Sequence, residues 1–381
     1  MYKGIVLALS TAAAVLGQCS SDITISDQSG VDAIGGCLKF KGSIKIDSFS
    51  GSSITLGSLQ TVEGDIMVNN SFNLATISMS KLEAVSGKFY VENNIQAVGV
   101  NVPSLSSVGD FQLVNNPNLS TLTFRNLGAA KTFRLVQSSV STLGALNFPQ
   151  IQDLEFSDNS FLSSVTLPNL TEITGTVVLV NNKPDMVVKF PKLDSIAKQL
   201  TVMNAASMNM TSLSKTTGTL NFRNNDFDSL DFPGLGNVSI DIQIVGNNNL
   251  KDMSFPVLPS ISGGLVIQDN PLITEIKDTY FSALNYVKGA LIISGPISNI
   301  TFPKLTRVDG AINITSTVDL DCNKVRAALA SKGKSRFSCK AKASSGSDVS
   351  TDSSALSLTV KPTHLFGSLI IGALFAAVCA F

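Results

Sequence analysis

A unit of about 22 residues returns along most of this chain, and this repeat limits the possible folds more than any other feature. Thirteen copies begin between Gly42 and Gly310, at a nearly constant spacing. Nine copies start at a glycine, as in "GDIMVNN" from Gly64, and the four weaker copies start at Lys131, Gln152, Lys198 and Ser239. A period of this length is typical of solenoids, in which each unit buries its apolar side against its neighbours.

The pattern inside each unit predicts a strand followed by corners. Apolar and polar residues alternate after the glycine, as at Ile66 and Val68, which is the period of a strand. "FPKL" occurs from Phe190 and again from Phe302, five units later, and its proline marks a corner that donates no ladder hydrogen bond. We therefore predict an all-β, β-helix-like solenoid of about 13 coils of about 22 residues.

Pairs of asparagines follow the strand in six units. They stand at Asn69-Asn70, Asn93-Asn94, Asn115-Asn116, Asn181-Asn182, Asn224-Asn225 and Asn247-Asn248. Asparagine tolerates left-handed backbone, and its amide can satisfy neighbouring backbone groups. We interpret these pairs as structural and not as a ligand site.

Four cysteines flank the repeats, since Cys379 falls in the apolar tail. The even number left, Cys19, Cys37, Cys322 and Cys339, is typical of an exported protein. The sequence alone does not fix their connectivity, but bridges within each end would close loops of similar size. We predict one disulfide before the first coil and one after the last, as caps on the open edges of the solenoid.

Both ends of the chain predict processing. A basic Lys3, an apolar run over 5–16 and a small Gly17 predict a signal peptide over 1–17 and a mature start at Gln18. Residues 365–381 are apolar, and no charge lies within them or after them, which favours a GPI signal over a single membrane span. We predict attachment at Ser353, with Ser350 and Gly346 as alternatives.

These features divide the chain into four parts. After the signal peptide, a single solenoid ectodomain spans 18–340, with an N-terminal cap over 18–41, coils over 42–318 and a C-terminal cap over 319–340. A short Ser-rich stalk over 341–353 and a GPI-signal propeptide over 354–381 follow.

The composition excludes several classes of function. Basic and acidic residues nearly balance in the mature chain, so no nucleic-acid partner is expected. The only histidine, His364, lies in the propeptide, which removes histidine-based catalysis and histidine metal ligands. We expect no cofactor and no metal. Asp153 and Glu155 are the best remaining pair for glycan chemistry, but we interpret them as a solvated strand face and predict no catalytic residue.

If the strands stack in register, one outward residue from each coil forms a column. Its members are Lys45, Met67, Tyr90, Gln112, Arg134, Glu155, Val178, Thr201, Asn221, Gln243, Val266, Ile292 and Asn313. Tyr90, Gln112, Arg134 and Glu155 combine an aromatic plane with planar donors and acceptors, which suits a sugar or a protein partner. We hypothesise that these four residues form a ligand face.

Two further features concern the surface. Sequons predict N-glycosylation at Asn69, Asn118, Asn169, Asn209, Asn237, Asn299 and Asn313. The interval from Gly263 to Gly289 is longer than the usual repeat, and its segment "DTYFSALN" carries Tyr280 and Phe281. We interpret this segment as a loop that packs its aromatic residues onto its own coil, with a binding loop as the alternative.

Taken in order, these motifs resemble a known family. The signal peptide, "CS" at Cys19, the unit "G-x-Φ-x-Φ-x-N-N-x-x-L", "FPKL", "DLDC" over 319–322 and the tail are similar to fungal GPI-anchored cell-wall organisation proteins. This is the extracellular-mutant and sporulation-specific family, whose ectodomain resembles receptor L-domains and leucine-rich repeats. The resemblance covers the whole chain, although the stalk is short and the units over 131–160 and 198–218 lack the glycine or the asparagine pair.

The resemblance implies a non-enzymatic role in wall organisation and integrity. It implies a GPI-anchored location at the plasma membrane or in the wall, with a wall polysaccharide or surface protein as candidate partner. A receptor-like ligand-binding module that uses the strand face is the first alternative. A wall-glycan-remodelling enzyme that uses Asp153 and Glu155 is the second.

Overall fold

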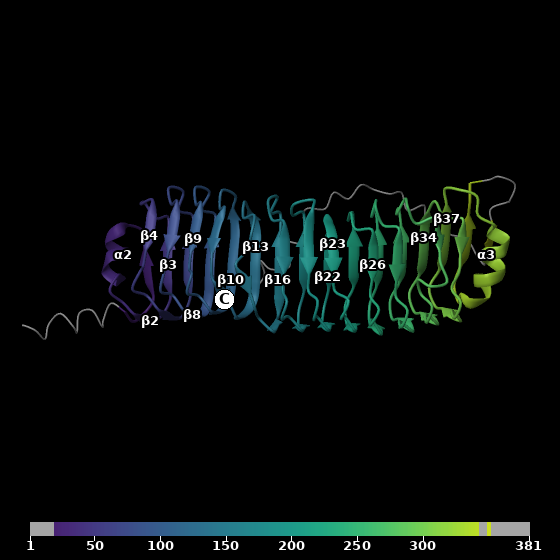
Figure 1. Ribbon diagram of the computed structural model, residues 1–381, viewed down its shortest axis with the longest axis horizontal. Coiled ribbons are helices and arrows are strands. Elements are labelled where there is room, and N and C mark those ends of the chain that lie inside the picture. Colours follow the sequence, from purple (N-terminus) through teal and green to yellow (C-terminus); the bar gives the residue numbers. More distant parts are fainter. Residues whose placement is uncertain (1–18, 343–348, 352–381) are drawn as a thin grey trace, which may run out of the picture. The chain divides into compact units, whose positions relative to one another are not determined.

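The computed structural model describes residues 19–342 and 349–351, and the strands of residues 19–342 stack side by side as a β-solenoid (Figure 1). The predicted signal peptide, attachment residue Ser353 and propeptide lie outside the described residues. No helix in the described ranges is long and apolar enough to cross a membrane.

The largest sheet is parallel and takes one strand from every repeat. In order of pairing its strands are β1 (Ile23–Ile25), β3 (Ile44–Asp47), β6 (Ile66–Asn69), β8 (Ala84–Glu92), β10 (Ser107–Asn116), β13 (Ala129–Ser138), β16 (Asp153–Ser157), β19 (Val177–Val180), β22 (Leu200–Met203), β25 (Leu220–Arg223), β28 (Ile242–Val245), β31 (Leu265–Gln268), β34 (Leu291–Gly295), β37 (Ile312–Ser316) and β38 (Phe337–Lys340). The 13 strands from β3 to β37 match the 13 sequence repeats one to one, which confirms the predicted solenoid.

Shorter strands form two further series around each coil. The second series pairs β4 (Ser53–Thr55), β7 (Thr76–Ser78), β9 (Gly99–Asn101) and β11 (Thr121–Thr123), then β17 (Ser164–Thr166), β20 (Met186–Lys189) and β23 (Ala205–Asn209), then β26 (Ser229–Asp231) with β29 (Asp252–Ser254) and β32 (Glu275–Ile276) with β35 (Asn299–Ile300). The third series pairs β2 (Lys39–Lys41) with β5 (Thr61–Glu63), and β15 (Gln150–Ile151), β18 (Glu172–Ile173), β21 (Ser195–Ile196), β24 (Lys215–Thr216), β27 (Asn237–Val238), β30 (Ser260–Ile261), β33 (Tyr286–Val287) and β36 (Arg307–Val308) in that order. β12 (Asn126–Leu127) pairs with β14 (Ala145–Leu146), and β39 spans Val349–Thr351.

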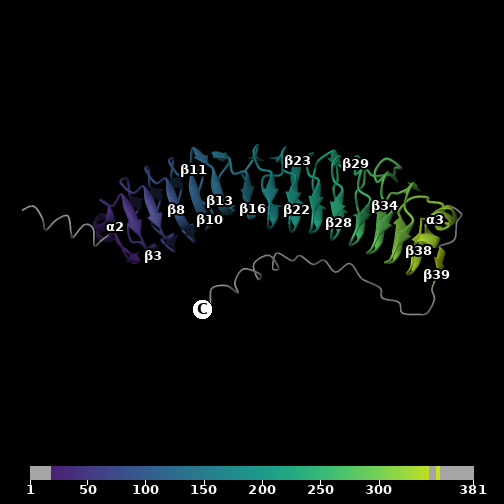
Figure 2. The ribbon, with the colours of Figure 1, turned by 90° about the horizontal axis from the view of Figure 1, so that it is seen from below.

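A short helix and a disulfide cover each end of the stack. α2 (Gln28–Ile34) lies at the first coil and α3 (Cys322–Leu329) at the last, followed by the 3₁₀ turn η1 (Ala330–Lys332) (Figure 2). Cys19 is bonded to Cys37 and Cys322 to Cys339, so both predicted bridges form. The caps cover sheet edges that would otherwise be open to pairing with another chain.

The two positions of an asparagine pair have different structural roles. One residue at or just after the end of the strand has left-handed backbone in ten coils, with φ between 51° and 61° at Ser48, Asn70, Asn93, Asn115, Gln137, Asp158, Asn181, Asn204, Asn224 and Asp269. Asparagine and aspartate adopt this conformation more readily than most residues. Eight of these ten residues are asparagine or aspartate, so the sequence places a turn former at the end of most strands.

The next residue is buried and bonds its coil to both neighbours. The Oδ1 of Asn94 accepts the backbone N–H of Ser71 at 2.9 Å, and its Nδ2 donates to the Val68 carbonyl at 2.9 Å. Equivalent bonds recur at Asn116, Asn159, Asn182, Asn225, Asn247 and Asn270. We call this row the asparagine ladder. The structural role predicted for the pairs is confirmed, although two pairs are shifted by one position. Ser71 takes the ladder place after Asn69-Asn70, and in Asn247-Asn248 the first residue takes it, after the left-handed Gly246.

The corners stack phenylalanines. Phe232, Phe255, Phe281 and Phe302 follow one another with ring centroids 5.4, 5.0 and 6.0 Å apart. Phe281 comes from the long interval, where "FSAL" takes the place of "FPKL". Phe281 and the preceding Tyr280 are both buried. The loop interpretation is therefore confirmed in that both aromatic residues pack into the core, and the segment is a divergent corner without its proline.

Candidate ligand-binding face

The outward column predicted from the repeat length is in register in the largest sheet. Consecutive strands pair Lys45 with Met67, Met67 with Tyr90, Tyr90 with Gln112, Gln112 with Arg134, Arg134 with Glu155, and so on to Ile292 with Asn313. We call this column and its flanking outward residues the strand face. The structure thus brings Tyr90, Gln112, Arg134 and Glu155 together on four neighbouring strands, and their role in binding stays a prediction.

Arg134 is held from both sides. Its Nε lies 2.6 Å from Glu155 Oε2, and its Nη1 donates to Gln112 Oε1 at 3.2 Å. The Arg134 side chain is 24% exposed and the Glu155 side chain 13% exposed, so the pair is only partly screened by water. A guanidinium fixed in this way presents one rigid plane at the surface, which lowers the entropy lost when a planar or hydroxylated partner binds.

The two carboxylates considered for glycan chemistry are both engaged. Asp153 Oδ1 accepts the backbone N–H of Thr176 at 2.8 Å and its hydroxyl at 2.9 Å. Glu155 binds Arg134 through one oxygen and accepts the Ser157 hydroxyl through the other at 3.0 Å. These contacts support the interpretation of both carboxylates as parts of the strand surface.

Beyond Glu155 the strand face has a second polar group. Val178 and Thr201 follow in the column, and the next polar group centres on Arg223. Arg223 donates from Nε to Asn221 Oδ1 at 2.8 Å and from Nη2 to Gln243 Oε1 at 2.6 Å. Sequence reasoning missed this second arginine cluster because Arg223 lies one outward position beyond the central column.

A third polar cluster, also missed, lies on the third series near the C-terminal cap. Tyr286 Oη donates to Asp309 Oδ2 at 2.7 Å, and Arg307 donates to both Asp309 oxygens at 2.7 and 2.8 Å. The Arg307 hydrogen bonds, and then the Tyr286 hydroxyl, hold the pKa of Asp309 well below its usual range. Tyr286 and Arg307 occupy equivalent places in "NYVKG" and "TRVDG", and aligning those two repeats would have revealed the contact.

The predicted glycosylation sites differ in their surroundings. Asn118, Asn169, Asn209 and Asn237 are exposed, whereas Asn69, Asn299 and Asn313 are partly buried. Asn69 and Asn313 lie on strands of the largest sheet, and the other five lie elsewhere on the coils. The Oδ1 of Asn69 is buried without a hydrogen-bond partner in the described structure. Occupancy of all seven sites stays a prediction.

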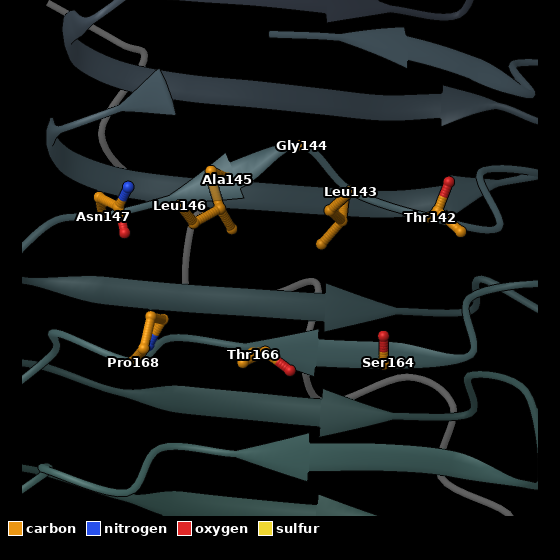
Figure 3. Close-up of a pocket in the computed structure, with 9 residues that line it drawn as sticks. All are labelled: Thr142, Leu143, Gly144, Ala145, Leu146, Asn147, Ser164, Thr166 and Pro168. Atoms are coloured by element: carbon orange, nitrogen blue, oxygen red, sulfur yellow. The ribbon is translucent and has the colours of Figure 1, made fainter. Parts of the chain in front are cut away.

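The described part of the solenoid has open depressions on its surface. One, of about 400 Å³, lies between the coil over 142–147 and β17 (Figure 3). Residues 19–342 hold no group of three or more His, Cys, Asp and Glu side chains arranged to bind a metal ion. The extended strand face is therefore the strongest candidate surface for binding, because it collects planar polar side chains in register.

Comparison with known proteins identifies relatives in fungi. A protein named ecm33 from Aspergillus fumigatus is 28% identical over 321 residues, covering 83% of this chain and 79% of the relative. A cell surface GPI-anchored protein from Arthroderma benhamiae is 28% identical over 346 residues, covering 84% and 82%. Sporulation-specific protein 2 from Saccharomyces cerevisiae is 26% identical over 290 residues, covering 75% of this chain and 57% of the relative.

No family model matches the chain, and no solved structure is similar to it. Two of these names describe surface location or sporulation, and none of the three names an enzyme. Over most of its length, the chain is a homologue of the fungal ecm33, GPI-anchored cell-surface and sporulation-specific proteins, which confirms the resemblance seen in its repeats.

Proposed function

We propose that this chain is a non-enzymatic, GPI-anchored surface glycoprotein that contributes to the organisation and integrity of a fungal cell wall. The homology to GPI-anchored cell-surface proteins over more than four fifths of the chain carries the proposal. The fold supports it, because the asparagine ladder, the capped ends and the engaged carboxylates all serve a stable scaffold. The domain limits expected from the sequence, with attachment at Ser353, are part of the proposal.

Deletion of the gene in its source fungus tests this role. Loss should sensitise cells to a chitin-binding dye, and the full chain should restore resistance. A form that ends at Ser353 and lacks the tail should be secreted and should restore little. The anchored form should also leave the cell surface after treatment with phosphatidylinositol-specific phospholipase C. Full rescue by the secreted form would contradict a role that depends on anchoring.

A ligand-binding module is the second candidate, and the fixed guanidinium of Arg134 beside Tyr90 and Gln112 favours it. Binding of soluble wall oligosaccharides of the glucan, mannan and chitin classes to the secreted ectodomain measures this directly. Tyr90→Ala should abolish saturable binding, whereas Lys45→Ala, at the end of the same column, should leave it unchanged. Equal affinities for both variants would remove the strand face from consideration.

Mass spectrometry of wall oligosaccharides incubated with the secreted ectodomain tests the absence of catalysis. We expect unchanged chain lengths, because Asp153 and Glu155 are both committed to neighbouring groups. New chain lengths that disappear in Glu155→Gln would replace the scaffold proposal with glycan remodelling.

A further inference from the structure

The second series of strands falls into four separate groups, and at the first break, between β11 and β17, one coil contributes no strand to the series. β11 pairs with β9 and β17 pairs with β20, and neither pairs with the coil between them in the described structure. That coil is nevertheless stacked in place. Ser139 N–H donates to the Leu119 carbonyl at 2.9 Å, and Ser163 N–H donates to the Ser141 carbonyl at 3.3 Å. The coil is therefore present but contributes no strand at this position.

Gly144 explains the interruption. A Cβ at this position would lie 2.1 Å from the Phe124 carbonyl oxygen and 2.8 Å from the Phe124 ring, so the backbone of Gly144 rests against the preceding coil. The chain bends there, away from the strand that carries Ser164 and Thr166 (Figure 3). The bend leaves the depression of about 400 Å³. Its walls include Asn147, Ser164, Thr166 and Pro168.

The bend leaves one edge of β17 without a backbone partner. Val187 N–H donates to the Ser163 carbonyl at 3.0 Å, and Leu167 N–H donates to the Lys189 carbonyl at 2.9 Å, so these groups point toward β20. Backbone groups of alternate residues in a strand point to opposite neighbours, and those of Ser164 and Thr166 therefore face the depression. Across residues 19–342, no backbone hydrogen bond joins either residue to the preceding coil. Unpaired edges of this kind are usually covered in native proteins.

An exposed sequon stands at the rim of the depression. Asn169 directly follows Pro168, which lines the wall, and it begins the sequon Asn169-Leu170-Thr171. Lys192 Nζ donates to Asn169 Oδ1 at 3.3 Å, and Asn169 Nδ2 donates to Asn147 Oδ1 at 3.4 Å. Asn147 is itself a wall residue. The atom that would carry a glycan, Nδ2, is thus turned toward the depression, while the carbonyl is held on the opposite side.

We propose that an N-linked glycan on Asn169 covers this break in the sheet. Its first N-acetylglucosamine lies over the depression and hydrogen-bonds the edge of β17 at Ser164 or Thr166. The acetamido group supplies one N–H and one C=O, the same groups that a neighbouring strand would have offered. The glycan would then be a structural part of the solenoid. This inference rests on export, which belongs to the proposed function, and not on any binding role.

Hydrogen exchange of the glycosylated ectodomain, secreted from a fungal host, tests the proposal. Asn169→Gln should speed amide exchange at Ser164 or Thr166 about fivefold, which corresponds to a hydrogen bond worth about 1 kcal/mol. Asn237→Gln, which removes another exposed sequon, should leave exchange there unchanged. Trimming the wild-type glycan to its first sugar should preserve the slow exchange, because that sugar makes the contact.

Variants at Thr171 separate the glycan from the asparagine itself. Thr171→Ala removes the sequon but keeps Asn169, and it should reproduce the fast exchange, whereas Thr171→Ser keeps the sequon and should not. Fast exchange in Asn169→Gln alone would assign the effect to the asparagine hydrogen bonds and overturn the proposal. An unmodified Asn169 beside occupied sequons would also overturn it. The absence of glycan from every sequon would refute export, and with it the proposed function.

Discussion

The asparagine ladder offers a sharp test of how this solenoid is held together, and Asn225 is a suitable place to break it. Its side chain is fully buried. Oδ1 accepts the Ala205 N–H at 3.0 Å, and Nδ2 donates to the Val202 carbonyl and to Asn247 Oδ1, both at 3.0 Å. Asn225→Ala therefore removes three hydrogen bonds that join three consecutive coils.

The expected loss of stability depends on whether each hydrogen-bond partner of Asn225 keeps another partner after the substitution. Ala205 N–H is left buried without an acceptor, which costs about 1–3 kcal/mol. Asn225 Nδ2 also loses its two hydrogen bonds, to the Val202 carbonyl and to Asn247 Oδ1. Asn247 Oδ1 still accepts the Asn225 backbone N–H at 3.0 Å, and we assign each of the two lost bonds the net value of a hydrogen bond, about 0.5–1.5 kcal/mol. The free energy of unfolding should fall by about 2–6 kcal/mol in total.

Urea denaturation followed by circular dichroism measures this loss. Asn248→Ala is the matched control, because Asn248 is the exposed neighbour of a ladder residue and its removal should change stability by less than about 0.5 kcal/mol. Hydrogen exchange should accelerate most at Ala205 and its neighbours. A loss below about 1 kcal/mol for Asn225→Ala would show that the ladder is not a main source of cohesion between coils.

Three further substitutions test other parts of the structure. Arg134→Met should destabilise the ectodomain by about 1–3 kcal/mol in urea denaturation, since it strips the partly buried Glu155 of its ion partner, and an unchanged midpoint would contradict this. Phe281→Ala should cost about 3–5 kcal/mol by the same assay, because its buried ring stacks between two corner rings, and a loss under about 1 kcal/mol would mean that the corner repacks. The lowered pKa of Asp309 means that its pairing with Arg307 stabilises the fold above about pH 4 and ceases to do so as the pH falls through that lowered pKa. Thermal melts of Asp309→Asn and wild type should therefore differ at pH 6 and converge in strong acid, and a difference that grows with acid would refute the linkage.

Repeat length alone predicted the strand register. Because each unit contributes one strand and the strands pair in parallel, counting from the first residue of each unit was enough to place Arg134 between Gln112 and Glu155. The caps followed from the positions of Cys19 and Cys322 outside the repeats. Both the register and the caps depend only on the spacing of residues along the chain, and that spacing can be read from one sequence.

Contacts that depend on side-chain conformation could not be predicted in this way. The corner at "FSAL" was not recognised because Ser282 stands where seven other corners, including both copies of "FPKL", have proline. The approach of Gly144 to the Phe124 carbonyl depends on how two irregular coils settle against each other. In the Asp309 cluster, the repeat places Tyr286 beside Arg307, but the hydrogen bonds of both to Asp309 depend on rotamers that the repeat does not specify.

The ladder also has two gaps, and they determine how the protein would respond to mechanical load. Ser138 and Ala205 stand where other coils have an asparagine, so neither residue has an amide that reaches back to the coil before it. The ladder is thereby divided into segments that end near 116, 182 and 270. Stretched along its axis, a solenoid yields where neighbouring coils adhere least. Single-molecule pulling should therefore show partial extensions that begin at these two junctions before the bonded segments give way.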